Sequence, residues 1–204
     1  MKKLTLLIAI LVSLSFVASA QLNFGVKAGL NMATYSGDAN NVQMKPSYQI
    51  GGVVNFDVGS GLTVQPGLIL SGKGTKSSEN SDVSVNTNYL EVPVNIVYNI
   101  SGFQVLAGPY LGYGLFGKMK GPDSDVDIKF KSDVSAEDYM LNEIYYNSID
   151  YGVNVGAGYV INESIQVQAM YSLGLANVNP KIDGEDPTSD TQNSVIQLTV
   201  SYFL

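Results

Sequence analysis

The stretch from Asn23 to Ala33, which reads NFGVKAGLNMA, decides the fold. Its even positions are all apolar, whereas its odd positions as far as Asn31 carry only glycine, asparagine and one lysine. Successive side chains of a β-strand point to opposite faces of the sheet. A strict period of two therefore predicts a strand with one apolar face and one small or polar face.

The same alternation returns seven more times, which predicts eight strands. The further strands cover residues 48–58, 62–71, 89–99, 103–115, 150–159, 165–174 and 196–202. Tight-turn compositions join them at 59–61, 101–102 and 162–163, and the other links are long, at 35–46, 73–88, 117–148 and 177–192. Short and long links alternate, which predicts an all-β, eight-stranded antiparallel up-and-down barrel of the transmembrane type.

A soluble barrel of the lipocalin kind is the competing architecture, since it also has eight strands. It would turn its apolar face inward and its polar face to water. Here the less apolar face is too rich in glycine for a water-exposed surface, and Tyr or Phe recurs near the ends of the apolar face, at 24, 48, 103, 159 and 202. Such aromatic residues are typical of the two interfaces of a membrane barrel, so the sequence favours that alternative.

The first twenty residues have the pattern of a secretory signal peptide. Lys2 and Lys3 precede the apolar stretch Leu4–Val17, and small residues follow at 18–20. A membrane anchor is the alternative, but the apolar stretch is shorter than the roughly 20 residues of a spanning helix. We therefore expect a cleaved signal peptide at 1–20, a barrel domain at 21–204 and export to the cell outer membrane.

The composition excludes several classes of function. The chain has 11 lysines, no arginine, 18 acidic residues, no His and no Cys, with a net charge of −7. The absence of His and Cys excludes zinc-finger ligand sets, thiolate nucleophiles and Ser–His pairs. The excess of acid makes a nucleic-acid partner improbable. Charged residues are only 14% of the chain, against about 25% in soluble domains, as expected for a lipid-facing surface.

Three segments resemble the small outer-membrane β-barrel domain family of Gram-negative bacteria, whose members are often labelled porin-like. They are QPGLILSGKG at 65–74, NYLEVPV at 88–94 and AGPYLGY at 107–113, and the ending LTVSYFL at 198–204 fits the last strand. The resemblance covers Gln21–Leu204 and implies fold and location more strongly than a defined activity. One departure is the C-terminal Leu204, with Phe203 penultimate, where the insertion machinery usually meets a terminal aromatic residue.

The inward face supplies the candidate site. An eight-stranded barrel has room only for its own inward side chains or one small ligand. The predicted inward charges are Lys27, Asp57, Glu91 and Asp150, with Lys73 near the rim. A buried charge is costly unless it is paired, so we expect Lys27 to meet one or more of these acids. The predicted lumen packing residues are Tyr89, Tyr110, Phe116 and Met170.

Chemistry beyond packing has little support in the sequence. A catalytic carboxylate pair would need to converge in a site, and Glu91 with Asp150 is the only inward candidate; we expect no catalytic residue and no cofactor. In the loop 117–148, Asp123, Asp125 and Asp127 have the first spacing of an EF-hand, but the sixth position is Ile128 instead of Gly and the twelfth is Val134 instead of Glu. They are weak candidates for a divalent-cation site, and a solvated acidic loop is the favoured interpretation.

The sequence thus predicts a non-enzymatic outer-membrane barrel with a mainly structural, surface-presenting role, a lumen closed by side chains and long acidic extracellular loops. A narrow porin-like channel for small cations or solutes is the first alternative, and an adhesin or receptor that acts through the loop 117–148 is the second. The expected partners are outer-membrane lipid, lipopolysaccharide and the barrel insertion machinery.

Overall fold

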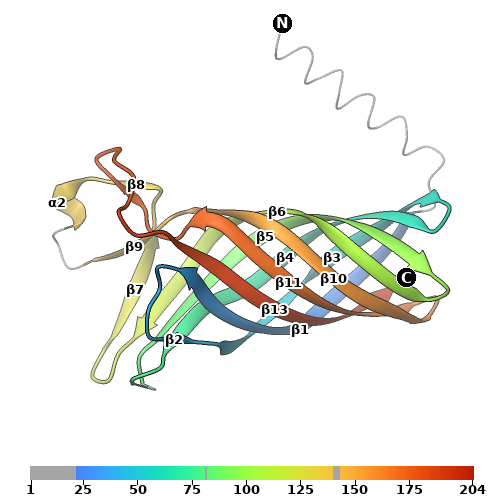
Figure 1. The fold of residues 1–204 in the computed structure, drawn as a ribbon, viewed down its shortest axis with the longest axis horizontal. Helices are drawn as coiled ribbons and strands as arrows, with labels where there is room; N and C mark the ends of the chain where they lie inside the picture. Colours follow the sequence, from blue (N-terminus) through green and yellow to red (C-terminus); the bar gives the residue numbers. More distant parts are fainter. Residues whose placement is uncertain (1–21, 81, 140–142) are drawn as a thin grey trace, which may run out of the picture.

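Eight long antiparallel strands form the body of the molecule (Figure 1). The computed structural model describes residues 22–80, 82–139 and 143–204, so the predicted signal peptide lies outside the described residues. The strands are β1 Leu22–Gly37, β3 Lys45–Gly59, β4 Leu62–Ser77, β5 Ser84–Ile100, β6 Phe103–Lys120, β10 Ile149–Asn162, β11 Ile165–Asn177 and β13 Thr191–Phe203. Each pairs with its neighbours in this order, and β13 pairs back onto β1. The predicted eight-stranded up-and-down barrel is confirmed.

The two ends of the barrel differ. The turn end carries the three short turns, at the positions that the sequence predicts. Ser60, Gly61, Ser101 and Gly102 all have positive φ there, between 52° and 93°. Glycine adopts this left-handed conformation without a steric penalty, which explains its place in two of the turns.

The loop end is more ordered than its polar composition suggests. It adds the short elements β2 Val42–Gln43, β7 Asp125–Phe130, β8 Asp133–Val134, α2 Ala136–Tyr139, β9 Ile144–Tyr146 and β12 Lys181–Ile182. The prediction of a long loop at 73–88 is wrong, because β4 and β5 continue to Ser77 and from Ser84 and pair over that range. Backbone hydrogen bonds between β4 and β5 hold this range as a sheet, although its polar side chains do not indicate a strand.

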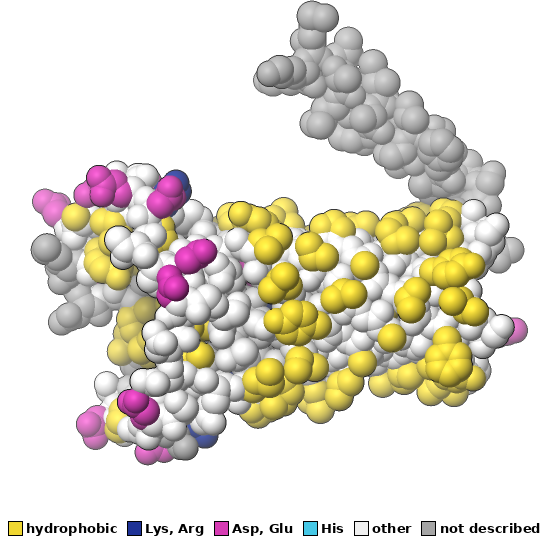
Figure 2. Space-filling model, in the orientation of Figure 1, with side chains coloured by type: hydrophobic (Ala, Val, Ile, Leu, Met, Phe, Trp, Pro, Cys, Tyr) yellow, Lys and Arg dark blue, Asp and Glu magenta, His cyan; other side chains and the backbone are white. Residues whose placement is uncertain are grey.

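The faces of the strands are segregated as the alternation predicts. Outward residues are apolar and largely exposed, for example Val26 at 62%, Leu30 at 65% and Leu198 at 58%. Figure 2 shows these apolar side chains over the barrel wall, while the acidic side chains gather mostly at the loop end. Among the described residues, no helix is long and apolar enough to cross a membrane.

A bulge in β6 corrects the prediction for Phe116. Tyr89 lies opposite Gly114, but Asn88 lies opposite Phe116, so Leu115 is an extra residue in β6. An extra residue reverses the side-chain alternation beyond it. Leu115 and Phe116 are consequently both on the outside, with Phe116 54% exposed, and the prediction that Phe116 packs in the lumen is wrong.

Candidate functional site

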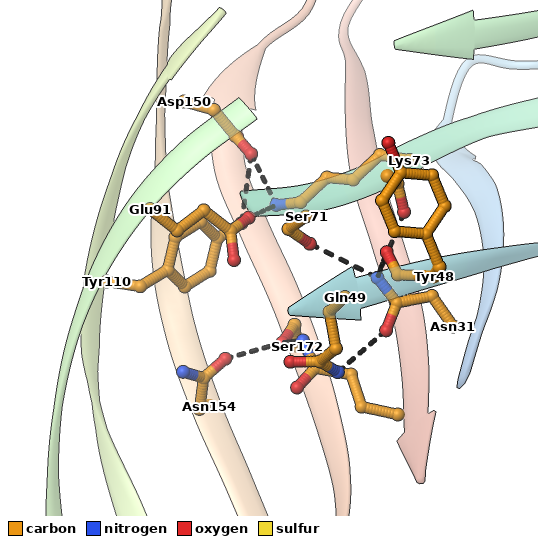
Figure 3. Close-up of polar contacts among 12 residues, drawn as sticks. Asn31, Tyr48, Gln49, Ser71, Lys73, Glu91, Tyr110, Asp150, Asn154 and Ser172 are labelled. Carbon is orange, nitrogen blue, oxygen red and sulfur yellow. Dashed lines mark hydrogen bonds and ion pairs between the residues drawn. The ribbon is translucent and has the colours of Figure 1, made fainter. Parts of the chain in front are cut away.

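The upper part of the lumen, toward the loop end, holds a buried ion cluster of Lys73, Glu91 and Asp150 (Figure 3). Lys73 Nζ lies 2.5 Å from Glu91 Oε1 and 2.7 Å from Asp150 Oδ2. The three residues are 1%, 5% and 2% exposed. One cation thus serves two carboxylates that water does not reach, and such a group tolerates little change because a buried charge needs its partner.

The register of the strands explains why the two acids meet. Gly112 of β6 lies opposite Glu91 of β5 on one side and opposite Asp150 of β10 on the other. A Cβ atom at Gly112 would lie 3.4 Å from Glu91 Cγ and 3.6 Å from Asp150 Cβ. The absence of a side chain at Gly112 therefore leaves the space in which both carboxylates reach Lys73.

Aromatic rings surround the ion cluster. Lys73 Nζ lies 4.3 Å from the ring centroid of Tyr110 and 5.5 Å from that of Tyr89, both within the range of a cation–π interaction. The Tyr110 hydroxyl donates to Asp150 Oδ2 at 3.4 Å. Tyr89, Tyr110 and Met170 are buried inside the barrel, at 1%, 4% and 5% exposure.

Phe130 occupies the place that the sequence suggests for Phe116. Its ring packs edge-on against Tyr89 at 5.4 Å between centroids. A Cβ atom at Gly114 would lie only 2.1 Å from Phe130 Cδ1, so the ring covers that glycine directly. An aromatic residue of β7 thus folds back over the lumen, which the local sequence pattern does not indicate.

Amide and hydroxyl side chains fill the middle of the lumen. Asn31 donates to Ser71 Oγ at 3.1 Å and accepts from Gln49 at 2.7 Å. A second chain runs from Gln197, which donates to Ser172 Oγ at 2.8 Å, and from Ser172 to Asn154. These contacts join neighbouring strands of the barrel on its inner face, β1 with β3 and β4, and β13 with β11 and β10 (Figure 3). Buried polar groups need such partners, so the network holds the inward faces together.

The structure places the ion-pair candidates differently from the prediction in two cases. Lys27 is buried but makes no ion pair with any acid in the described part of the chain. Its Nζ donates instead to Gln168 Oε1 at 2.8 Å and Gln65 Oε1 at 3.3 Å. Asp57 is exposed beside the turn and accepts a hydrogen bond from the Gly59 amide at 2.8 Å. The prediction that Lys27 pairs with an inward acid is therefore wrong.

Lys73 lies deeper in the barrel than the sequence predicts. It is two residues from the inward Ser71, so the period of two places its side chain on the inward face. The sequence predicts a position near the rim because the predicted strand 62–71 ends before Lys73. The strand continues to Ser77, so Lys73 belongs to the lumen wall.

The loop end forms a second ordered region, which we call the loop platform (residues 121–139, 143–148 and 178–190). The parallel pair β8–β12 joins the two longest links, and the Asp183 and Asp133 carboxylates accept hydrogen bonds from Ala136 N at 3.3 Å and Gly184 N at 3.1 Å. Val134 of β8 is buried in this region, at 1% exposure. Two links far apart in sequence therefore make one body.

Charged pairs decorate this platform. Lys129 and the Tyr145 hydroxyl both donate to Glu143. The hydrogen bond from Lys129 holds the pKa of Glu143 below its usual range, and the hydrogen bond to Glu143 raises the pKa of Tyr145 to about 12. Lys131 lowers the pKa of Asp138 in the same way.

The weak metal candidates do not converge. Asp125 and Asp127 lie on β7, opposite Lys120 and Lys118, and Asp127 pairs with Lys118 at 3.6 Å. Asp123 lies in the turn before β7. No group of three or more acidic side chains suited to a metal ion occurs among residues 22–80, 82–139 and 143–204.

Comparison with known proteins gives a family match and similar solved structures. Residues 17–179 match the family described as outer membrane protein beta-barrel domain. Neisserial surface protein A (NspA) is similar in structure, with a TM-score of 0.53 and 12% identity over 88% of this chain and 96% of that chain. Ail, the attachment invasion locus protein of Yersinia pestis, has a TM-score of 0.48 and 9% identity over 89% of this chain and 98% of that chain. No curated protein matches the sequence.

Proposed function

Because this chain belongs to the outer membrane protein beta-barrel domain family, we propose that it is a closed barrel whose main role is to hold an ordered loop platform at the cell surface. Its apolar wall contacts outer-membrane lipid, and lipopolysaccharide surrounds the loop end. Residues 1–20 direct export and are removed, and the barrel insertion machinery assembles the strands.

The buried ion cluster carries this proposal. Lys73, Glu91 and Asp150 come from three strands and meet in the lumen with Tyr89 and Tyr110 against them. An ion that passes this level would have to displace a cation held by two carboxylates in a buried site. The desolvation cost of breaking such a group is several kcal/mol per charge, which favours closure over conduction.

Conductance in planar lipid bilayers tests the closed lumen. The wild-type barrel should give no steady openings. A variant that removes all three charges, K73A/E91A/D150A, should leak small ions because it empties the level of the ion cluster without stranding a buried charge. Heat-modifiable migration on gels shows that both proteins are folded.

A narrow channel is the alternative, and a substitution at Gly112 distinguishes a conducting lumen from a closed one. If the wild type shows steady cation-selective openings that the substitution Gly112→Leu abolishes, the lumen conducts and the proposal fails. Leucine at this position would fill the space beside Glu91 and Asp150. A matched substitution on the outer wall, Leu111→Val, should leave any conductance unchanged.

Recognition of an extracellular partner is a second candidate function, favoured by the order of the loop platform. Two links locked together by β8–β12 present a fixed surface, and a preorganised surface loses little entropy on binding. Bacteria that display the wild type should adhere to immobilised matrix proteins more strongly than bacteria that display a variant without residues 121–143. Equal adherence, with both barrels folded, would exclude this role.

A further inference from the structure

Lys27 is a buried cation without an anionic partner. Its side chain comes from β1 and is 3% exposed overall. All 18 acidic residues lie in the described part of the chain, and none of them is within ion-pair distance of Lys27 Nζ. Among the described residues, the ammonium donates hydrogen bonds to two amide oxygens, of Gln65 and Gln168. An isolated buried charge is costly, so this position calls for a negative charge that the chain does not provide.

The ion cluster in the upper lumen is too far away to provide that charge. Gln65, which touches Lys27, precedes Ile69 by four residues on β4, and Ile69 lies opposite Glu91. At about 3.3 Å per residue, the level of Lys27 and the level of the two carboxylates are roughly 13 Å apart along the strand. Both carboxylates there are already committed to Lys73.

Three further hydrogen-bonding groups near Lys27 have no partner within residues 22–80, 82–139 and 143–204. They are Gln168 Nε2, Thr199 Oγ1 and Ser201 Oγ, and their residues are 3%, 4% and 0% exposed. Each group can donate a hydrogen bond, and a buried donor without a partner costs free energy. Most buried donors in native proteins have a hydrogen-bond partner, so these groups call for one.

The register brings these donors to one place. Ser201 of β13 lies directly opposite Lys27 of β1, and Thr199 lies between Gly29 of β1 and Gln168 of β11. Residues directly opposite in an antiparallel pair have Cβ atoms about 5 Å apart. Thr199 also leans over Gly29, since its Cγ2 is 2.7 Å from where a Cβ of that glycine would stand. Three adjacent strands thus direct an ammonium and three donors to one level.

We propose that this cluster, Lys27, Gln168, Thr199 and Ser201, binds a small inorganic anion of the halide type, with chloride as the physiological ligand. The charge of Lys27 selects an anion, and the amide and hydroxyl donors complete its shell. A monatomic ion fits better than phosphate or sulfate, because side chains fill the lumen above and Phe203, at 6% exposure, lies against Gly25 one step below. The site is independent of closure at Lys73.

Anomalous diffraction from the full barrel, crystallised in bromide, tests the site directly. A bromide peak within hydrogen-bond distance of Lys27 Nζ and beside Ser201 is the expected result. A water molecule in that position, or an uncharged amine that needs no counter-ion, would give no anomalous peak and would overturn the proposal.

Thermal unfolding of the detergent-solubilised protein gives a second measurement. The wild type should melt several degrees higher in chloride than in gluconate at equal ionic strength, because a ligand that binds only the folded state stabilises it. Lys27→Met should lose this difference, and the exposed Lys120→Met should keep it. If Lys27→Met does not fold, the double variant T199V/S201A should show a weaker chloride effect. Equal melting of the wild type in both salts contradicts the proposal.

Discussion

At the residue scale, the decisive feature is one lysine that serves two buried carboxylates. Lys73 holds Glu91 and Asp150 at 2.5 and 2.7 Å, and all three residues are buried. The group gives little net stability compared with apolar packing, but removing one member leaves the others unpaired. The contribution of the ion cluster to stability is therefore best measured with variants that remove only some of its members.

Lys73→Met should destabilise the barrel by about 3–5 kcal/mol, because two carboxylates are then buried without a cation. Equilibrium unfolding in urea, with the protein in lipid vesicles, measures the loss. The triple variant K73M/E91Q/D150N should recover much of it, since no charge is left behind. The exposed Lys118→Met should have an effect near zero, and a similar loss in K118M and K73M would refute the argument.

We expect Glu143 in the loop platform to make a pH-dependent contribution to stability. Lys129 donates to its carboxylate and lowers the pKa of Glu143. A depressed folded-state pKa means that the stabilisation is present above the usual glutamate value of about 4.3 and is lost as the pH falls through the lower, folded value. Carbon-13 NMR of the Glu143 carboxyl should show a midpoint below 4.3 in the wild type, and Lys129→Gln should raise it. Identical midpoints would contradict the assignment.

At the element scale, a single bulge changes the direction in which the side chains at the end of β6 point. Leu115 is the extra residue, and it sends Phe116 outward while Phe130 of β7 covers Gly114. Bulges re-aim side chains at the rims of barrels. The bulge and the folded-back β7 together connect the lumen to the loop platform.

Gly114→Val should therefore disturb the platform while the barrel stays folded. The new side chain would clash with the Phe130 ring, whose Cδ1 lies 2.1 Å from an ideal Cβ. Overpacking of this kind costs about 1–3 kcal/mol. Limited proteolysis should cut the segment 121–143 faster than in the wild type, with heat-modifiable migration unchanged. The control Leu115→Val, on the outer face, should be cut at the wild-type rate.

At the scale of the whole molecule, polarity is arranged inside out. The outer wall is apolar and exposed (Figure 2), while the interior holds amides, hydroxyls and the ion cluster. This arrangement is stable only if the apolar wall contacts lipid. The hydrocarbon region holds no water to solvate a charge, so the charged side chains lie inside the barrel or at its ends.

Leu30→Arg should accordingly destabilise the barrel by about 2–4 kcal/mol in lipid vesicles, as measured by urea unfolding. Leu30 is 65% exposed on the wall, so the change removes no interior packing. Val126→Lys, on β7 at the loop end, should cost little because that segment lies in water. Equal losses for the two variants would mean that the wall is not in the hydrocarbon region.

The sequence by itself determined the strands, their two faces and the alternation of short and long links. These features depend on a local rule, the period of two, which holds whatever the neighbouring strand is. The inward placement of Glu91, Asp150, Tyr89 and Tyr110 follows from the same rule.

Only the tertiary structure decided which inward groups meet. The period of two predicts that the side chains of Lys27 and Lys73 both point inward, but the tilt and stagger of the strands set their depth in the barrel. Lys73 consequently reaches both acids, whereas Lys27 lies at a level of amides and hydroxyls. The bulge at Leu115 and the return of Phe130 depend on contacts between strands distant in sequence, and no local pattern encodes them.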